Sequence, residues 1–343
     1  MPHRTFMSFI WPSALAMLLF IALPIVSVAV QSLFVAHDQV FVTVENCGPF
    51  GCTTVQKVDP QATAALRDAQ PLGQFNGLGT YLNRNHLATA EISQAWVARS
   101  GFAEFMSKVL NLPFYKALSF TLTYTFLVTP FVIILGFFVA LAVNRLPSFF
   151  KGPTIFVSLL PMIVTPLIGS LILFWMIDAD GVIGGTLQLI FENPDLSLKA
   201  SPALTWATLI VYGVWHSAPF SFIVFYAGLQ TVPKDTLESA MIDGANRWEQ
   251  VRYVVIPHLV PLVVFISLMQ LMDNFRVFEP IVGFNAEASA TSLSWIIYND
   301  LRGTDGNILF GSAAATSLLT IIGVCILLTP VLIRTWRAHG VRG

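Results

Sequence analysis

The sequence predicts an all-α, polytopic membrane protein with six transmembrane helices, and three observations support that fold class. Charged residues are 11% of the 343 residues and hydrophobic residues are 55%, so the chain has too few charges to cover a water-soluble surface. Six apolar stretches each reach the length of about 20 residues that a helix needs to cross a bilayer. They are also too long for the strands of a membrane barrel, which alternate over about ten residues.

The six stretches are separated by more polar segments. They lie at 9–30, 117–143, 154–177, 203–229, 258–283 and 308–333. The first contains 22 residues without a charge, whereas the apolar core of a secretory signal has about 7–15. We therefore expect the first helix to be retained in the membrane. Residues 27–29 have the small-x-small pattern of a signal cleavage site, and cleavage there would leave the downstream topology unchanged.

Basic residues predict the orientation of the chain. If the N-terminus is cytoplasmic, the inside segments are 1–8, 144–153, 230–257 and 334–343, and they hold nine Lys and Arg against four Asp and Glu. The remainder of the chain holds nine basic and fifteen acidic residues. This asymmetry is what the positive-inside rule expects, so both termini should be cytoplasmic. The net charge of −1 gives no indication of a nucleic-acid partner.

One segment between the predicted helices is long enough to form a small external subdomain. The predicted parts are a first helix at 1–31, an external segment at 32–116, a core of five helices at 117–335 and a cytoplasmic tail at 336–343. In the external segment, Gly-Pro-Phe-Gly separates Cys47 from Cys52, and such a turn can bring the two sulfur atoms together. An oxidising compartment favours a disulfide between them. A metal site is the weaker alternative, because further His or Cys ligands are missing nearby.

The inside segment 230–257 is predicted to form a short helix, a glycine turn and a second short helix. Pro233 is tolerated at a helix start, and Gly244 can take the left-handed conformation that ends the first helix. A small apolar face follows helical spacing at Leu237, Ala240 and Met241. On physical grounds this face suits either the groove of a partner protein or the surface of the bilayer.

The same segment resembles the EAA motif of the binding-protein-dependent ABC importer permeases. That motif is Glu-Ala-Ala, three residues, Gly, nine residues and then Ile-x-Leu-Pro. The chain keeps this spacing with Glu238, Ala240, Gly244 and Pro257. The residues around the motif are most similar to the sugar-permease branch, which includes the relatives of the maltose and glycerol-phosphate permeases. The resemblance covers about 117–335 and implies the type I importer permease architecture.

The resemblance also implies a division of labour between subunits. By analogy with the family, Glu238, Ala240, Asp243 and Gly244 belong to a coupling helix that docks on an ATPase dimer. The sequence contains no G-x-x-x-x-G-K-[ST] phosphate loop, so we expect no cofactor in this chain and ATP with Mg²⁺ on the partner ATPase. The other implied partners are a second homologous permease and a periplasmic solute-binding protein, all at a bacterial inner membrane.

Polar and aromatic residues within the fourth and fifth stretches are candidates for substrate contacts, since ionisable groups are costly there. The candidates are Trp215, His216, Asp273, Asn274, Arg276 and Glu279. Aromatic faces stack on sugar rings and carboxylates accept hydroxyl hydrogens, so this mixture suits a sugar or sugar derivative. The alternative is a structural cluster in which Arg276 pairs with Asp273, three residues earlier, or with Glu279 on the same helical face.

Two other classes of function are compatible with a polytopic chain. An ion-coupled secondary transporter would not explain the spaced Glu, Gly and Pro residues of the inside segment. An intramembrane enzyme is disfavoured because no serine–base pair and no H-E-x-x-H pattern is present. The family's Thr-rich, Gly-Gly-Pro segment after the fifth stretch is replaced at 284–291, so the sequence leaves the particular substrate open. The sequence therefore favours a non-catalytic permease subunit.

Overall fold

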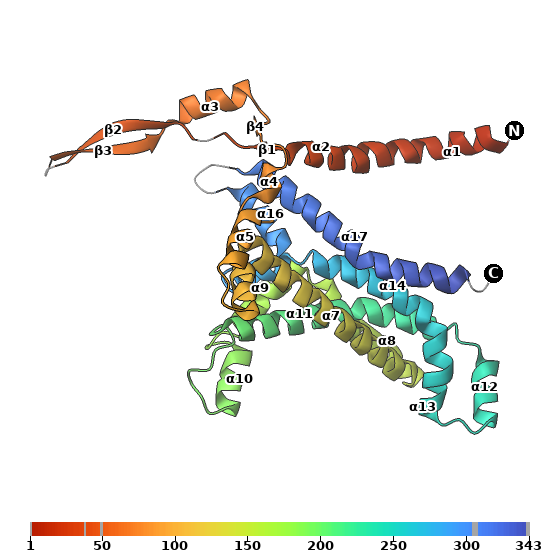
Figure 1. The fold of residues 1–343 in the computed structure, drawn as a ribbon. Coiled ribbons are helices and arrows are strands. Elements are labelled where there is room, and N and C mark those ends of the chain that lie inside the picture. Colours follow the sequence, from red (N-terminus) through yellow and green to blue (C-terminus); the bar gives the residue numbers. More distant parts are fainter. Residues whose placement is uncertain (1, 38, 49–50, 304–307, 341–343) are drawn as a thin grey trace. The chain divides into compact units, whose positions relative to one another are not determined.

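The protein is described by a computed structural model (Figure 1). The described residues are 2–37, 39–48, 51–303 and 308–340. Contacts divide the chain into two compact units, of which the first joins 1–116 to 296–322 and the second joins 117–295 to 323–343. Each unit is described by itself.

Five helices of the described chain are long and apolar enough to cross a membrane, and the number reaches the predicted six when one bent helix pair counts as a single span. The spans are Phe6–Gln31, Pro113–Asn144, Ser148–Ile163 with Pro166–Met176, Pro202–Leu229, Arg247–Phe275 and Phe310–Arg334. The bent pair is a feature that the apolar pattern does not predict: α8 (Ser148–Ile163) and α9 (Pro166–Met176) meet at 93°. Thr165 is extended, with ψ of 141°, because a residue before proline is disfavoured in the helical region.

The first unit begins with the first span and continues into a mixed segment. The span consists of α1 (Pro2–Met17), the π-helical turn η1 (Leu18–Ala22) and α2 (Leu23–Gln31). Two antiparallel pairs follow, β1 (Phe34–Val35) with β4 (Gln74–Phe75) and β2 (Phe41–Gly48) with β3 (Gly51–Val58). The helices of this segment are α3 (Pro60–Ala69), α4 (Gly79–Leu82), α5 (Thr89–Val97) and α6 (Phe102–Leu110).

A fully buried histidine joins distant parts of the first unit. His86 has no exposed surface, and its two ring nitrogens lie 2.8 Å from Asn83 Oδ1 and 3.1 Å from the carbonyl oxygen of Ser312. The Ser312 hydroxyl donates to Asp300 over 2.7 Å. Burial lowers the pKa of His86 and raises the pKa of Asp300, because both charged forms lose hydration. The cluster therefore ties the segment after α4 to the beginning of the last span.

The second unit is a bundle of long helices with short helices at its ends. Its elements are α7 (Pro113–Asn144), α8, α9, α10 (Val182–Ile190), α11 (Pro202–Leu229), α12 (Lys234–Ile242), α13 (Arg247–Gln250), the π-helical turn η2 (Val251–Val255), α14 (Ile256–Phe275) and α15 (Glu279–Gly283). Two further helices, α16 (Leu293–Arg302) and α17 (Phe310–Gly340), run from one unit into the other. Within the bundle, α11 packs on α8 and α14, and α15 packs on α9.

α7 and α11 approach each other closely at Gly136. A side chain at Gly136 would meet Ser221 Cβ at 2.5 Å and the backbone nitrogen of Phe222 at 2.8 Å. Large side chains fill the space on either side of this contact, since Phe222, Phe225 and Leu209 of α11 are almost fully buried. Small residues let membrane helices approach closely enough to gain dispersion contacts that lipid does not replace.

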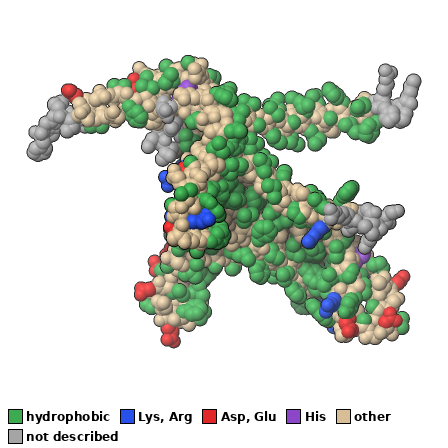
Figure 2. Space-filling view, in the orientation of Figure 1, with side chains coloured by type: hydrophobic (Ala, Val, Ile, Leu, Met, Phe, Trp, Pro, Cys, Tyr) green, Lys and Arg blue, Asp and Glu red, His purple; other side chains and the backbone are tan. Residues whose placement is uncertain are grey.

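Charge is distributed as expected for helices surrounded by lipid. Figure 2 shows hydrophobic side chains over most of the visible face along the long helices, with acidic side chains around α10 and both acidic and basic side chains around α12–α13. The first span is extreme in this respect, because none of its most apolar window is buried inside the structure. Lipid or a partner subunit must therefore cover it.

The backbone register bears on the predicted disulfide. The β2–β3 pairing places Cys47 opposite Cys52. Directly opposed residues of an antiparallel pair have Cβ atoms about 4.5–5.5 Å apart, close to the separation that a disulfide bridges. The side chains of this pair lie outside the part of the chain that the structure describes, so the disulfide stays a prediction.

We expect Cys47 and Cys52 to be oxidised in the folded protein, because an isolated two-stranded hairpin is marginally stable without further support. Alkylation of the denatured, unreduced chain followed by intact-mass measurement should label Cys325 alone. Reduction before alkylation should add two further labels, and Cys47→Ser supplies the control in which Cys52 is always labelled. Labelling of all three thiols without a reductant would contradict the disulfide.

Candidate functional site

The segment between α11 and α14 begins with α12, which ends as the glycine spacing predicts. Gly244 has a φ of +84°, a conformation that glycine adopts without steric cost. Its N–H donates to the carbonyl oxygen of Met241 over 3.1 Å, and the N–H of Ala245 donates to Ala240 over 2.9 Å. This pair of bonds is a Schellman motif, which satisfies two carbonyl groups that the helix end would leave open.

A capping box starts the second short helix of this segment. The Asn246 side chain accepts from the backbone N–H groups of Trp248 and Glu249 over 2.9 and 3.0 Å, and Glu249 accepts from the N–H of Asn246 over 2.7 Å. The chain then passes through η2 into α14, and Pro257 lies in the first turn of α14. Consecutive caps therefore fix the direction of both short helices without long-range contacts.

The apolar side chains of the segment face in two directions, which differs from the single apolar face predicted at Leu237, Ala240 and Met241. Leu237 packs against a buried cluster of α7, α11 and α14, and Ala240 is half-buried. Met241 is 54% exposed, Ile242 is 87% exposed and Trp248 is 60% exposed. Sequence reasoning missed Ile242 and Trp248, although large apolar residues in an otherwise polar, solvent-facing segment are the signal that could have found them.

Beneath the short helices lies a cleft of about 420 Å³. It is lined by residues of α7, α11, α12, α13 and η2, including Asn144, Arg145, Leu237 and Arg247. The cleft separates part of the α12–η2 segment from the ends of α7 and α11. The backbone of the segment is stabilised by its own capping hydrogen bonds at Gly244 and Asn246. The segment continues from η2 into α14 without a loop.

The break between α8 and α9 is held from α11. His216 Nε2 donates to the carbonyl oxygen of Val164 over 3.1 Å, and the Tyr212 hydroxyl donates to the carbonyl oxygen of Pro166 over 2.8 Å. A broken helix in a membrane needs such partners, because lipid cannot accept or donate hydrogen bonds. His216, a predicted substrate contact, is therefore placed by the structure as a support of the break.

An apolar cleft of about 630 Å³ adjoins the break. It is lined by α9, α10 and α11, and Trp215 contributes to it with 49% of its surface exposed. The polar side chains of the lining have partners within the chain, since Tyr212 is bonded to Pro166 and Thr208 donates to Leu204 over 2.9 Å. The cleft as it stands thus fits apolar groups or an aromatic face.

The predicted residues of the fifth span divide into three different environments. Arg276 and Asp273 form an ion pair of 2.7 Å with about half of each side chain exposed, at 60% and 53%. Asn274 is buried and donates to Thr129 over 3.1 Å and to Gln270 over 3.4 Å. Glu279 was predicted to continue the helical face of Asp273 and Arg276, and this is wrong, because α14 ends at Phe275 and Glu279 starts α15.

The structure therefore brings some of the candidates together and separates others. Trp215 and His216 lie beside the break of the third span, whereas Asp273 and Arg276 satisfy each other at the end of α14. Glu279 is exposed, and its backbone oxygen lies 3.4 Å from the Ser170 hydroxyl of α9. Pairing of Arg276 with an acid, one of the predicted possibilities, is confirmed. Contact of any of these residues with a substrate stays a prediction.

We expect Asn274→Leu to destabilise the fold and Asp273→Asn to leave it almost unchanged. The first change leaves the polar groups of Thr129 and Gln270 without their partner, at a cost of about 1–3 kcal/mol, whereas an exposed ion pair contributes about 0–1 kcal/mol. Thermal unfolding of the purified variants in detergent measures both. Equal transition temperatures for Asn274→Leu and the unchanged chain would contradict a packing role for Asn274.

Comparisons with known proteins agree with this architecture. Residues 102–336 match the family described as the binding-protein-dependent transport system inner membrane component. A probable ABC transporter permease of Sinorhizobium fredii is 28% identical over 250 residues, which cover 70% of this chain and 77% of that protein. The trehalose transport system permease SugA of Mycobacterium tuberculosis is 26% identical over 257 residues, which cover 75% of this chain and 80% of that protein.

A third relative and a solved structure agree with these matches. The trehalose/maltose transport system permease MalF of Thermococcus litoralis is 26% identical over 227 residues, covering 65% of this chain and 75% of that protein. A chain of a bacterial ABC transporter involved in the import of the acidic polysaccharide alginate has the same fold, with a TM-score of 0.58 and 21% identity over 81% of this chain and 96% of that chain. With a family match over more than half of its length, the chain belongs to the inner membrane components of the binding-protein-dependent transport systems.

Proposed function

We propose that this permease is the translocation subunit of an ATP-driven importer for a sugar or sugar derivative, with both termini in the cytoplasm. ATP with Mg²⁺ is bound and hydrolysed by a separate ATPase dimer, a second homologous permease completes the pathway, and a periplasmic binding protein delivers the substrate. The observation that carries the proposal is the segment from α12 to η2, which continues directly into the fifth span.

The geometry of this segment supports a role in coupling to the ATPases. Glu238 and Asp243 are exposed on or beside α12, next to the exposed side chains of Met241 and Ile242. An apolar patch rimmed by carboxylates is the kind of surface that enters a groove on a partner protein. Gly244 and Ala240 then have structural roles, because they form the turn that presents this patch. A push on α12 would reach α14 across the short turn at 243–246 and then through α13 and η2, which continue into α14 without a loop.

The substrate class rests on the relatives and on the charges near the fifth span. Two relatives carry trehalose or trehalose/maltose in their names, and the structural relative imports an acidic polysaccharide. Arg276 is already neutralised by Asp273, which favours a neutral sugar over an anionic one. Trp215, exposed in the cleft beside the broken third span, offers an aromatic face on which a sugar ring can stack.

We expect Gly244→Ala to impair transport and ATPase binding. Alanine at this φ costs about 1–2 kcal/mol, and since no atom lies within 4 Å of the added methyl group, backbone strain is the only penalty. Gly152→Ala is the matched control, because its methyl group also enters open space and its backbone is helical. Membrane insertion should be equal in both variants, while association with the ATPase and uptake should fall only in Gly244→Ala. Equal uptake would contradict the coupling role.

Uptake into vesicles that hold the whole complex tests the energy source and the substrate class. A neutral oligosaccharide with its binding protein should accumulate only when ATP is present on the side of the membrane that carries the ATPases. Accumulation driven by a proton or sodium gradient alone would indicate a secondary transporter.

Arg276→Gln should change the uptake of a neutral sugar less than about twofold, since an exposed ion pair contributes little. A loss greater than about tenfold for an anionic sugar with that variant would move the proposal to anionic substrates.

A further inference from the structure

The helical hairpin of α5 and α6 lies directly before the second span. α6 ends at Leu110 and α7 begins at Pro113, so only Asn111 and Leu112 separate them. A link of this length reaches about 10 Å at most, so the end of α6 is tethered to the point where the span begins. The hairpin and the first turn of α7 also belong to the same compact unit of the chain.

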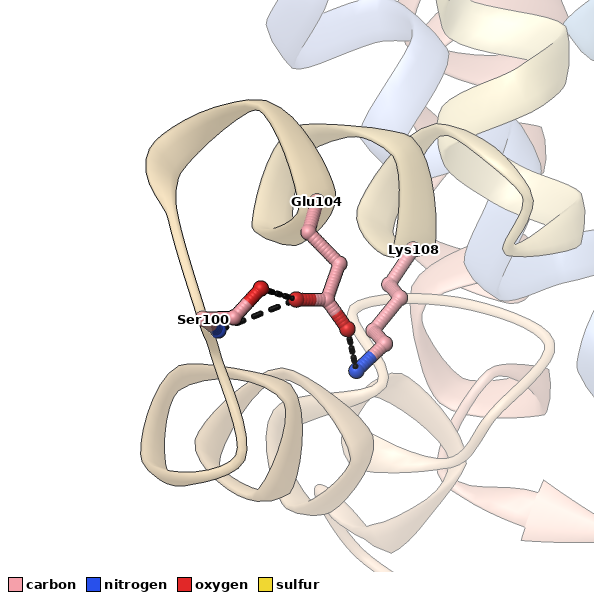
Figure 3. Close-up of polar contacts among 3 residues, drawn as sticks. All are labelled: Ser100, Glu104 and Lys108. Carbon is pink, nitrogen blue, oxygen red and sulfur yellow. Dashed lines mark hydrogen bonds and ion pairs between the residues drawn. The ribbon is translucent and has the colours of Figure 1, made fainter.

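The polar side chains on one side of α6 form hydrogen bonds and an ion pair within the hairpin. Figure 3 shows Glu104 and Lys108 of α6 beside Ser100, which precedes the helix. Glu104 accepts from Lys108 over 2.7 Å, from the backbone N–H of Ser100 over 2.9 Å and from the Ser100 hydroxyl. These bonds to Lys108 and Ser100 hold the pKa of Glu104 at about 2, so its charge is present at any ordinary pH. Trp96 of α5 meets Phe105 edge-on, with ring centres 5.2 Å apart.

The other side of α6 is apolar and open. Phe102 is 71% exposed, Met106 is 37% exposed and Leu110 is 41% exposed. Spacing of four residues places these three side chains in one stripe along the helix, whereas Ser107 lies on another face and Asn111 follows the helix end. A stripe of this kind in contact with water is unfavourable, and a helix with one apolar and one charged face is typical of segments that lie in a membrane interface.

Two observations identify lipid as the occupant of this face. The tether to α7 holds the stripe at the level where the chain enters the hydrocarbon region, so the apolar surface of the span and that of α6 are neighbours along the chain. Trp96, 51% exposed at the end of α5, carries the Arg99 guanidinium 3.3 Å from its ring centre. Tryptophan is enriched at the headgroup level, and an arginine beside it suits phosphate groups there.

We propose that α6 lies on the membrane surface beside the start of α7 and buries Phe102, Met106 and Leu110 among the lipid chains, so that the bilayer itself is the partner of this face. The polar network of Ser100, Glu104 and Lys108 then faces away from the lipid and keeps the hairpin closed. A helix held in this way anchors the beginning of the second span at a fixed depth while the rest of the bundle moves.

Spin labels on the full-length chain test this placement. Single cysteines replace Phe102, Met106 or Leu110 in the stripe. The exposed controls are Ser107 of the same helix and Asn111 directly after it, in a chain whose native cysteines are changed to serine. The complex is reconstituted in vesicles of phosphatidylethanolamine and phosphatidylglycerol. Power saturation with oxygen and with a water-soluble nickel chelate should show the three stripe labels more accessible to oxygen, and both control labels more accessible to nickel.

Two results would overturn the proposal. Stripe labels that nickel reaches as readily as the controls would place this face in water. Stripe labels that neither oxygen nor nickel reaches would show that a protein covers it, either a partner subunit or a binding protein.

A second measurement leaves α6 unaltered. The fluorescence of Trp96 is obtained as the difference between the unchanged chain and Trp96→Phe. Bromine atoms on the acyl chains near the headgroups should quench this fluorescence more than bromine atoms near the ends of the acyl chains. Unquenched Trp96 fluorescence with both lipids would contradict the proposal even where a cysteine variant fails to fold. Neither measurement depends on transport, so failure here is separate from failure of the proposed function.

Discussion

Backbone hydrogen bonding in lipid is the constraint on which the rest of this structure depends. Each N–H and C=O group of a span needs a partner inside the chain, so the spans are helical and any interruption must be compensated. Pro166 interrupts the third span, and Tyr212 and His216 of the neighbouring α11 supply hydrogen bonds to carbonyl groups at the break. These two hydrogen bonds also connect the break to α11, beside the cleft that Trp215 lines.

The same constraint explains how polar side chains are used elsewhere. Asn274 bonds Thr129 across two helices, and Asp273 pairs with Arg276 where the fifth span ends. In the segment that we propose as the ATPase contact, caps satisfy the backbone locally, so the side chains of Met241, Ile242 and Trp248 need no partner within the chain and face outward. Exposed apolar side chains on a backbone whose hydrogen bonds are satisfied locally are available for contact with another protein.

The sequence by itself determined the class of the protein, its six spans and the turn at Gly244. These features follow from local properties: apolar length sets a span, and a left-handed turn requires glycine. The family was also accessible, because the spacing of Glu238, Gly244 and Pro257 lies within one contiguous segment. Local spacing further predicted that Arg276 pairs with a nearby acid, since Asp273 lies one helical turn before it.

Only the tertiary structure decided the roles of the polar residues in the spans and the direction of the exposed apolar ones. His216 supports the break because α11 packs against it, and Glu279 leaves the face of Asp273 because α14 ends at Phe275. Leu237 turns inward and Ile242 outward, since the ends of α7 and α11 lie beneath one side of α12. The physical reason is the same in each case: a side chain's role depends on the helices that pack beside it, and those neighbours come from distant parts of the sequence.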